Sequence, residues 1–404
     1  MNMAKTHLQC RECKKEYDPT FKYICDECFG PLDVKYNFPS ITKDQFKERE
    51  STYWRYFELL PIEDKNNIVS INAGMTPLVK AEKLGKELGL NNLYIKNDSV
   101  NPTFSFKDRP AGVAISKAKE FGLKSVGCAS TGNLAGATAA HGAKAGLNTI
   151  VFVPKNLEEG KIFGAAIFGS VVKVNGNYDD VNRLCSELGD DRRWAFVNIN
   201  MRPYYSEGSK TLAFEIIEQL NWSLPDNIIV PVASGSLYTK VWKGLNEFQK
   251  LGLVEAKNTR MHIAQPFGCS PVSTAYINGE SHPKPVVPNT VAKSLAIGNP
   301  ADGYYSVKIA NDSSGTASIV PESQVAEGIK LLAETEGIFT ETAGGVVISA
   351  LKNLSKTKSI NKNEKTVVLI TGTGLKTIEA VRDSITIDTI EPNISSFDDI
   401  VTNK

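Results

Sequence analysis

The stretch SVGCASTGNLAGATAAHGAKA, residues 125–145, contains a strand pattern, a turn and a helix pattern in direct succession. Residues 125–129 form a short apolar run that is typical of a buried strand, and the alanine-rich residues 134–145 have a helical pattern. The turn between them consists of Ser130, Thr131, Gly132 and Asn133. Hydroxyls, an amide and free backbone N–H groups at a helix N-terminus can bind a carboxylate or a phosphate. A simple helix cap made by Ser130 or Thr131 explains the same residues without a ligand.

Similar patterns recur along the chain and predict the fold class. We expect further strands at residues 149–153, 170–174, 194–197, 227–232, 262–265 and 366–370. The stretches 179–188 and 207–220 can hold connecting helices. Repeated strand–helix–strand units predict an α/β protein with mostly parallel sheets that are covered by helices on both faces. In such sheets ligands bind at the loops that follow the carboxyl ends of the strands.

Length and composition limit the class of protein. A chain of 404 residues with 41% hydrophobic and 23% charged residues is large enough for two or three domains with sizeable cores. Its formal net charge of +1 provides no broad positive field for nucleic acid or for an anionic membrane. No apolar run approaches the length of a membrane span, and the first ten residues lack the apolar centre of a signal peptide. We therefore expect a cytoplasmic protein.

The first 40 residues contain four of the seven cysteines. Cys10 and Cys13 form one Cys-x-x-Cys pair, and Cys25 and Cys28 form a second. In a reducing compartment such pairs indicate metal binding more than disulfides, and four thiolates can hold a structural zinc ion. Two alternatives are a ribbon that folds without metal and a redox-active pair of cysteines. The spacing predicts a small zinc-ribbon-like module at residues 1–40.

Lys107 lies in the run NPTFSFKDRP, residues 101–110. Pro110 fits the first turn of a helix, so Lys107 should lie at or just before a helix N-terminus. A lysine is a poor nucleophile while it is protonated, and burial or a positive helix end favours the neutral amine that can attack an aldehyde. The alternative is a surface lysine at a helix start that pairs with Asp108.

Two further turns follow predicted strands. Residues 233–237, with the sequence ASGSL, have small side chains that allow backbone N–H groups to surround a phosphate. Residues 371–374, with the sequence TGTG, follow the last strong strand pattern. Each signal is weak alone, because many strand–helix turns have similar compositions.

Together these segments resemble the threonine synthases and their relatives among the pyridoxal-phosphate enzymes of fold type II. The resemblance covers most of the chain in the same order. Besides the turns already described, it rests on GMTPL (74–78), EGSKT (207–211), IGNP (297–300), ETAGG (341–345) and TGTGLK (371–376).

The resemblance implies roles for individual residues. Lys107 would bind pyridoxal 5′-phosphate (PLP) as a Schiff base, Asn133 would contact the phenolic oxygen of the cofactor, and Thr371 would contact the pyridine nitrogen. A hydroxyl at that nitrogen tempers the ring as an electron sink. The cofactor phosphate would be held by the turn Ala233, Ser234, Gly235, Ser236 and Leu237. Ser130 and Thr131 would bind the anionic ends of the substrate.

The sequence also departs from the usual family pattern. Tyr205 replaces an arginine that usually precedes EGSKT. If that arginine binds the substrate phosphate in the family, either Arg202 or Lys210 takes its place here or the substrate differs. The 233–237 turn lacks the usual asparagines, although its backbone donors remain. Phe104 and Pro110 stand where glycine is common.

The resemblance implies two doubly wound, mostly parallel-sheet domains with the active site between them. The ribbon at 1–40 would precede a large PLP-binding domain, residues 41–112 and 201–404, and a small domain, residues 113–200. The implied activity is that of a lyase of threonine biosynthesis, which converts O-phospho-L-homoserine and water to L-threonine and phosphate. A homodimer is expected from the resemblance alone.

Two other functions compete with this one. A threonine/serine dehydratase or a β-replacement synthase of the same fold would need no site for a substrate phosphate. A zinc-ribbon binding protein whose α/β body no longer catalyses would use the basic ribbon residues, such as Arg11 and Lys14, to bind nucleic acid. Acidic residues are interleaved with these basic ones and weaken that alternative.

Overall fold

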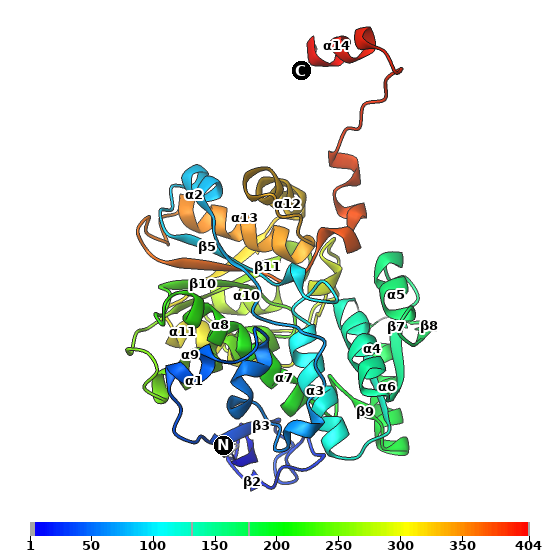
Figure 1. Ribbon diagram of the computed structural model, residues 1–404, viewed down its shortest axis with the longest axis vertical. Coiled ribbons are helices and arrows are strands. Elements are labelled where there is room, and N and C mark those ends of the chain that lie inside the picture. The colour runs from blue at the N-terminus through cyan, green and yellow to red at the C-terminus, as the bar shows by residue number, and fades with distance from the viewer. Residues whose placement is uncertain (1–4, 131, 177, 403–404) are drawn as a thin grey trace.

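A computed structural model of the protein describes residues 5–130, 132–176 and 178–402. Within these ranges the strands form three sheets with different connectivity. Figure 1 shows the N-terminal sheet at one end of the molecule and the C-terminal tail at the other. None of the helices in the described ranges is long and apolar enough to cross a membrane.

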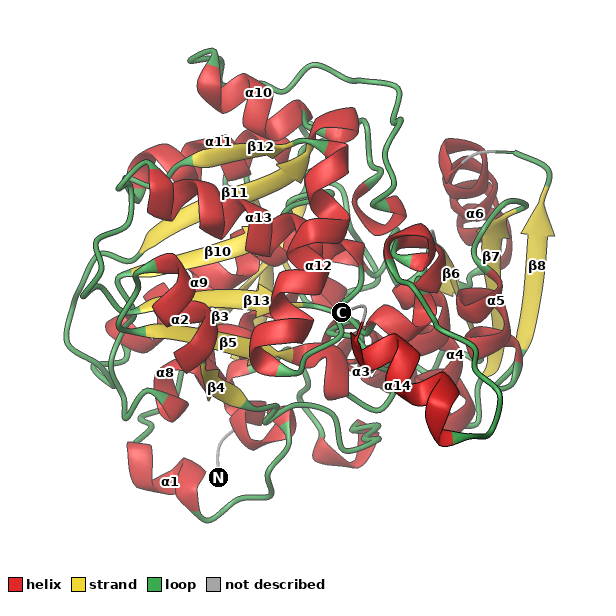
Figure 2. Cartoon of the chain, turned by 90° about the horizontal axis from the view of Figure 1, so that it is seen from above, coloured by secondary structure: helices red, strands yellow, loops and turns green. Residues whose placement is uncertain are grey.

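The largest sheet has six strands in the order β12-β11-β10-β13-β5-β4. Neighbouring strands are parallel except β4 and β5, which are antiparallel. Their bounds are β4 Leu78–Lys80, β5 Leu93–Asn97, β10 Asn227–Pro231, β11 Arg260–Pro266, β12 Ala317–Val320 and β13 Thr366–Ile370. Figure 2 shows these strands side by side, with the smaller sheet beyond helices α3 and α4.

Helices cover both faces of the large sheet. On one face lie α8 (Thr211–Gln219), α9 (Ser236–Lys250), α10 (Pro271–Ile277) and α11 (Gly303–Asp312). The other face is covered by α2 (Glu82–Leu88), α12 (Glu322–Glu336) and α13 (Thr342–Lys356). Successive strand residues point to opposite faces, so Ile228 and Val230 pack in the first core and Ile229 in the second. Strands buried on both faces are apolar throughout, which explains their continuous sequence pattern.

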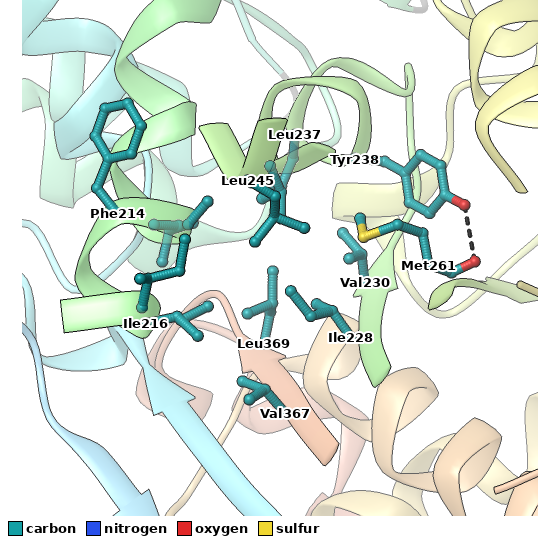
Figure 3. Close-up of a cluster of buried hydrophobic side chains, with 14 of the residues drawn as sticks. Phe214, Ile216, Ile228, Val230, Leu237, Tyr238, Leu245, Met261, Val367 and Leu369 are labelled. Atoms are coloured by element: carbon teal, nitrogen blue, oxygen red, sulfur yellow. Dashed lines mark hydrogen bonds between the residues drawn. The ribbon is translucent and has the colours of Figure 1, made fainter. Parts of the chain in front are cut away.

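Figure 3 shows the core between α8, α9 and the central strands. Ile228, Val230, Val367 and Leu369 of β10 and β13 pack against Phe214, Ile216 and Leu245 of the helices. The one polar atom that Tyr238 brings into this core is satisfied, because its hydroxyl donates a hydrogen bond of 2.9 Å to the backbone oxygen of Met261. The packed core fixes α9, whose N-terminus carries the 233–237 turn.

The second α/β sheet has four parallel strands in the order β8-β7-β6-β9. The strands are β6 Ser125–Ala129, β7 Asn148–Pro154, β8 Ser170–Val174 and β9 Ala195–Phe196. The helices around it are α3 Asp108–Glu120, α4 Asn133–Ala145, α5 Glu159–Ala166, α6 Tyr178–Arg192 and α7 Arg202–Glu207. The strands expected from the sequence lie within two residues of the observed ones, whereas β4, β5 and β12 were not expected.

The N-terminal segment folds into an antiparallel sheet of β1 (Lys5–Cys10), β2 (Glu16–Tyr17) and β3 (Leu32–Asn37). A connector with α1 (Lys43–Lys47) and a 3₁₀ segment, Tyr53–Leu59, joins it to the body. Every residue of Tyr53–Leu59 is buried, so this connector is part of the packed structure. At the other end, residues 385–393 are exposed and lead to α14 (Ile394–Thr402), which lies away from the body in Figure 1.

Candidate active site

One cavity lies at the carboxyl ends of the central strands of both α/β sheets. Ala129 at the end of β6, Pro231 at the end of β10 and Thr371 after β13 all line it. The predicted residues around this space are Lys107, Ser130, Asn133, Arg202, Ala233, Ser234, Gly235, Ser236, Leu237 and Thr371. Residues from five separate sequence segments are therefore brought to one site, at the place where α/β folds bind ligands.

Lys107 immediately precedes α3 and points into this cavity. Its Nζ donates a hydrogen bond of 3.1 Å to the hydroxyl of Tyr205, and it lies 4.6 Å from the centre of the Phe106 ring. The carboxylate of Asp108 instead accepts hydrogen bonds of 2.8 Å from the backbone and the hydroxyl of Thr103. The amine is therefore held by an uncharged hydroxyl at the cavity wall, not by the neighbouring acid.

A buried ion cluster fixes the first turn of α3 beside Lys107. Arg109 is fully buried, and its guanidinium forms two hydrogen bonds to Asp98, of 2.6 and 2.9 Å. On the other side it binds both carboxylate oxygens of Glu215, one of them at 2.7 Å. Lys96 donates to the same Glu215 carboxylate at 2.6 Å. Burial alone would raise the pKa of Glu215, but Arg109 and Lys96 lower it to about 2.

The 233–237 turn has the features of a phosphate site. It leads into α9, a helix of fifteen residues whose N-terminal N–H groups favour an anion. Gly235 has a φ of 93°, and a side chain there would meet the Ser306 hydroxyl at 2.5 Å and the Asp302 backbone oxygen at 2.8 Å. Among the described residues, the buried hydroxyl oxygen of Ser236 has no hydrogen-bond partner. An anion such as the phosphate of PLP would supply that partner, so the residues present fit the group.

Asn133 and Thr371 meet across the cavity through a buried carboxylate. The Asn133 amide donates to Glu341 at 2.8 Å, and the Thr371 hydroxyl donates to the other Glu341 oxygen at 3.3 Å. Lys376 donates to the Asn133 amide oxygen at 3.3 Å. Burial lowers the pKa of Lys376, although Glu341 opposes this shift. One hydrogen of the Asn133 amide is donated to Glu341, and this bond fixes the orientation of the amide group. The second hydrogen of the amide remains available to a ligand in the cavity.

Ser130 performs the capping role that its position allows. Its hydroxyl oxygen accepts hydrogen bonds of 3.0 Å from the backbone N–H groups of Gly132 and Ala135, and the residue is only 2% exposed. Ser130 still lines the cavity, so capping orders the loop that faces a ligand. Thr131, which was expected to act beside it, lies outside the described residues.

The two candidate cations for a substrate phosphate lie in different places. Arg202 begins α7 and lines the cavity beside Tyr178 and Tyr205. Lys210 is fully buried away from the cavity, where it pairs with Glu207 at 2.8 Å and with Glu247 at 2.9 Å. These two acids and the Tyr36 ring, 3.9 Å from the amine, surround Lys210. Of these two cations, only Arg202 therefore remains a candidate for binding the substrate phosphate.

Several cavity residues had not been singled out from the sequence, among them Tyr178 and Glu341, which carry ionisable groups. Tyr178, at the start of α6, is close to Tyr205 and Arg202, and burial raises its pKa to about 12, so its hydroxyl stays protonated. Glu341 is the first residue of the segment 341–345. No local pattern in that segment indicates that its carboxylate lies between Asn133 and Thr371.

Phe104 is held in an unusual backbone conformation near the site. Its φ of 59° lies in the left-handed region, which glycine adopts at least cost. Its backbone oxygen accepts a hydrogen bond of 3.2 Å from the N–H of Thr373, and this contact fixes the conformation. The geometry explains why glycine suits this position, at which the chain has phenylalanine.

The four cysteines of the ribbon converge at a second location. Their sulfur atoms all lie within 4.8 Å of one another, with Cys10 and Cys28 3.4 Å apart and Cys13 and Cys25 3.5 Å apart. Four sulfurs around a tetrahedral zinc ion, with bonds of about 2.3 Å, would be roughly 3.8 Å apart. The arrangement fits a Cys₄ zinc centre.

Comparison with known proteins agrees with this geometry. Residues 69–372 match the family described as pyridoxal-phosphate dependent enzyme. The chain is 37% identical over 383 residues to a threonine synthase of Methanocaldococcus jannaschii, covering 92% of this chain and 93% of that protein. It is 36% identical to a threonine synthase of Methanosarcina acetivorans, covering 98% of this chain and 99% of the other.

A solved structure has the same fold. Threonine deaminase isoform 2 from Solanum lycopersicum is similar with a TM-score of 0.63 and 25% identity, over 76% of this chain and 83% of that one. Lys107, the 233–237 turn and Thr371 thus lie around one cavity. The family match over residues 69–372 and the threonine synthase relatives both indicate a PLP enzyme. The protein belongs to the pyridoxal-phosphate-dependent enzymes of fold type II, in the threonine synthase family.

Proposed function

We propose that the protein converts O-phospho-L-homoserine and water to L-threonine and phosphate. The observation that supports this most directly is the position of Arg202, which brings a guanidinium into the cavity that Lys107 and the 233–237 turn also line. A cofactor phosphate held by the turn leaves Arg202 for a second phosphate, that of the substrate. The identity of 36–37% with threonine synthases, over more than nine-tenths of the chain, supports the same substrate.

Each residue of the cavity has a role in this proposal. PLP, when bound, accepts the electron pair that remains when a carbon–hydrogen bond beside the amino group breaks. Lys107 would hold the cofactor until the substrate amine displaces it, and its freed amine would serve as the base that removes a proton from Cα and then one from Cβ. Phosphate would leave from Cγ, a proton would return to Cγ, the hydroxyl of water would add at Cβ, and a proton would return to Cα. Tyr205, 3.1 Å from the amine, keeps Lys107 on the cavity side.

The remaining side chains bind and orient. Asn133 is aligned by Glu341 and Lys376, and we propose that it contacts the phenolic oxygen of the cofactor. Thr371 would contact the pyridine nitrogen, and the turn Ala233, Ser234, Gly235, Ser236 and Leu237 would hold the cofactor phosphate. Ser130 would bind an anionic end of the substrate from the loop that it caps.

The ribbon is proposed to hold one structural zinc ion through Cys10, Cys13, Cys25 and Cys28. Four thiolates leave no open position for catalysis. We further propose that the chain is divided into the ribbon, a large domain and a small domain. The protein is proposed to act in the cytoplasm and to assemble as a homodimer.

A direct assay separates this activity from that of a dehydratase. The PLP-loaded protein should release phosphate from O-phospho-L-homoserine and form threonine, whereas a threonine/serine dehydratase would release ammonia from threonine. Arg202→Ala should raise the KM for phosphohomoserine much more than it changes any turnover of threonine. Arg183→Ala removes an arginine that is exposed and paired with Glu187, so it serves as the matched control. Ammonia release from threonine without phosphate release from phosphohomoserine would contradict the proposal.

A further inference from the structure

The zinc-ribbon-like module reaches the candidate active site through one buried aspartate. Arg11 lies between two of the clustered cysteines, Cys10 and Cys13. Its Nη1 binds Oδ1 of Asp302 at 2.6 Å, and the Nη2 of Arg202 binds the other oxygen, Oδ2, at 2.5 Å. One carboxylate therefore bridges a guanidinium from the ribbon and a guanidinium that lines the cavity.

The bridge is well defined on the ribbon side. The Arg11 guanidinium carbon lies 3.2 Å from the centre of the Tyr305 ring, and the Tyr305 hydroxyl donates a hydrogen bond to Glu12. The Arg11 backbone N–H donates to Pro31 at 3.0 Å. Asp302 is 5% exposed, so its carboxylate is largely shielded from water. Stacking on Tyr305 and the backbone contact hold the Arg11 guanidinium against this carboxylate.

The same aspartate supports the phosphate turn with its backbone. The Asp302 N–H donates to the backbone oxygen of Ser234 at 2.8 Å, and its own backbone oxygen accepts from Ser306. That oxygen also faces Gly235, where any side chain would collide with it. Asp302 is thus in contact with the turn, with Arg202 and with the ribbon.

The charges of this bridge determine how strongly Arg202 attracts an anion. A lone Asp302–Arg202 pair would be neutral, so a phosphate at Arg202 would have to compete with the carboxylate. With Arg11 on the other carboxylate oxygen, two positive charges share one negative charge and the group keeps a net charge of +1. The difference between a net charge of 0 and one of +1 affects anion binding strongly here, because partly buried charges are screened less than charges in water.

We propose that Arg11 is a positioning residue for substrate binding: by sharing Asp302, the ribbon leaves Arg202 with the positive charge needed to bind the substrate phosphate. This inference rests on the proposed function of Arg202. It gives the ribbon a role besides its own fold, because Arg11 sets the electrostatics of a cavity to which it does not itself belong.

Binding of inorganic phosphate to the PLP-loaded protein tests the proposal without requiring turnover. Arg11→Ala should raise the dissociation constant of phosphate, measured by calorimetry, about five- to tenfold. Arg11→Lys, which keeps the charge, should recover part of the loss. Asp302→Asn should bind phosphate as well as or better than the wild type. Arg11→Ala combined with Asp302→Asn leaves the same net charge of +1 as in the wild type, so it should restore an affinity close to that of the wild type. Lys22→Ala removes a ribbon cation that pairs with Asp26 within the ribbon, and it should bind like the wild type.

A merely structural contact gives a different pattern. If Arg11 only anchors the ribbon, Asp302→Asn breaks the same anchor and weakens phosphate binding as Arg11→Ala does. That result, an unchanged dissociation constant in Arg11→Ala, or a wild type that binds no phosphate would each overturn the proposal. Metal content and melting temperature, measured on every variant, identify a protein that has lost its ribbon. A wild type that binds phosphate but does not turn over phosphohomoserine contradicts the proposed function and leaves the Arg11 proposal standing.

Discussion

The amide of Asn133 donates a hydrogen bond of 2.8 Å to the carboxylate of Glu341, which lies 208 positions later in the chain. Glu341 is 2% exposed, and the hydroxyl of Thr371 donates to its other oxygen. The hydroxyl hydrogen of Thr371 is therefore directed at Glu341, and the lone pairs of its oxygen are left for the cavity. A single buried carboxylate orients two side chains that we assign to opposite parts of the cofactor ring.

Glu341→Gln should weaken the binding of PLP. The substitution removes the charge from the acceptor, and a hydrogen bond to a charged group contributes about 1.5–3 kcal/mol. We expect the dissociation constant of PLP to rise roughly tenfold, measured by equilibrium dialysis of the protein stripped of cofactor. Glu334→Gln changes an exposed glutamate in α12 and is the matched control. Equal affinities in wild type and Glu341→Gln would show that the carboxylate does not orient the cofactor's partners.

Lys107→Ala should abolish covalent attachment of PLP. After borohydride reduction, the mass of the wild-type chain should increase by one reduced cofactor, whereas the variant should keep its unmodified mass. Lys119→Ala, which removes a lysine near the other end of α3, should be labelled like the wild type. Labelling of Lys107→Ala at the wild-type level would place the attachment elsewhere.

Arg109→Ala should destabilise the fold severely. The change leaves the buried carboxylates of Asp98 and Glu215 without their main cation, and breaking a buried ion pair in this way costs about 3–5 kcal/mol. The free energy of unfolding from urea titration measures the loss. Lys308→Ala breaks an exposed pair with Asp312 in α11 and should change that free energy by less than about 1 kcal/mol. A loss of similar size in both variants would contradict the importance of the cluster.

His262 should make stability depend on pH in a defined window. Burial lowers its pKa from 6.5 to about 4, while its ring nitrogens contact Thr316 and Asn227. Because the folded state resists protonation, the contribution is fully present above pH 6.5. It is lost as the pH falls toward 4, and amounts to roughly 3 kcal/mol over the window.

In unfolding experiments between these pH values, the difference in stability between wild type and His262→Gln should therefore shrink as the pH falls. The exposed His282, which stacks on Tyr304, provides the control, because His282→Gln should follow the wild-type curve. A constant difference between wild type and His262→Gln across the window would show that the histidine does not titrate as described.

The ribbon should contain one zinc ion for each chain. Elemental analysis of the purified protein measures it, and Cys10→Ser or Cys25→Ser should lower the content because each removes one of four thiolates. Cys185→Ala changes a buried cysteine of α6 outside this cluster and should retain the metal. Zinc content unaffected by either serine substitution would exclude the Cys₄ site.

Sequence reasoning was most successful where the pattern is local. The strands 125–129 and 366–370 are buried on both faces and appear as continuous apolar runs, and the 233–237 turn follows from small residues between a strand and a helix. By contrast, β5 contains two buried polar residues, Lys96 and Asn97, and the amine of Lys96 is satisfied by the distant carboxylate of Glu215. A local apolar pattern therefore could not reveal that strand.

The contacts that complete the site join remote positions. Arg11 and Asp302 are 291 positions apart, and neither residue has a sequence context that points to the other. The choice between Arg202 and Lys210 likewise depended on burial, because both are cations near the same motif and only the packing of Glu207 and Glu247 around Lys210 separates them. Such pairings become visible only once the chain is folded.

The pairing of β5 with β13 has a consequence for the order of events during synthesis. Leu93 is aligned with Thr366, and an isolated bridge joins Ser105 to Gly372, so the loop that carries Lys107 is held by a strand made near the end of translation. The strands of the small parallel sheet, residues 125–196, are all synthesised before β13. The cofactor site cannot form until residue 372 has emerged from the ribosome. A nascent chain, or one truncated before this residue, therefore lacks a complete binding site for the aldehyde of PLP.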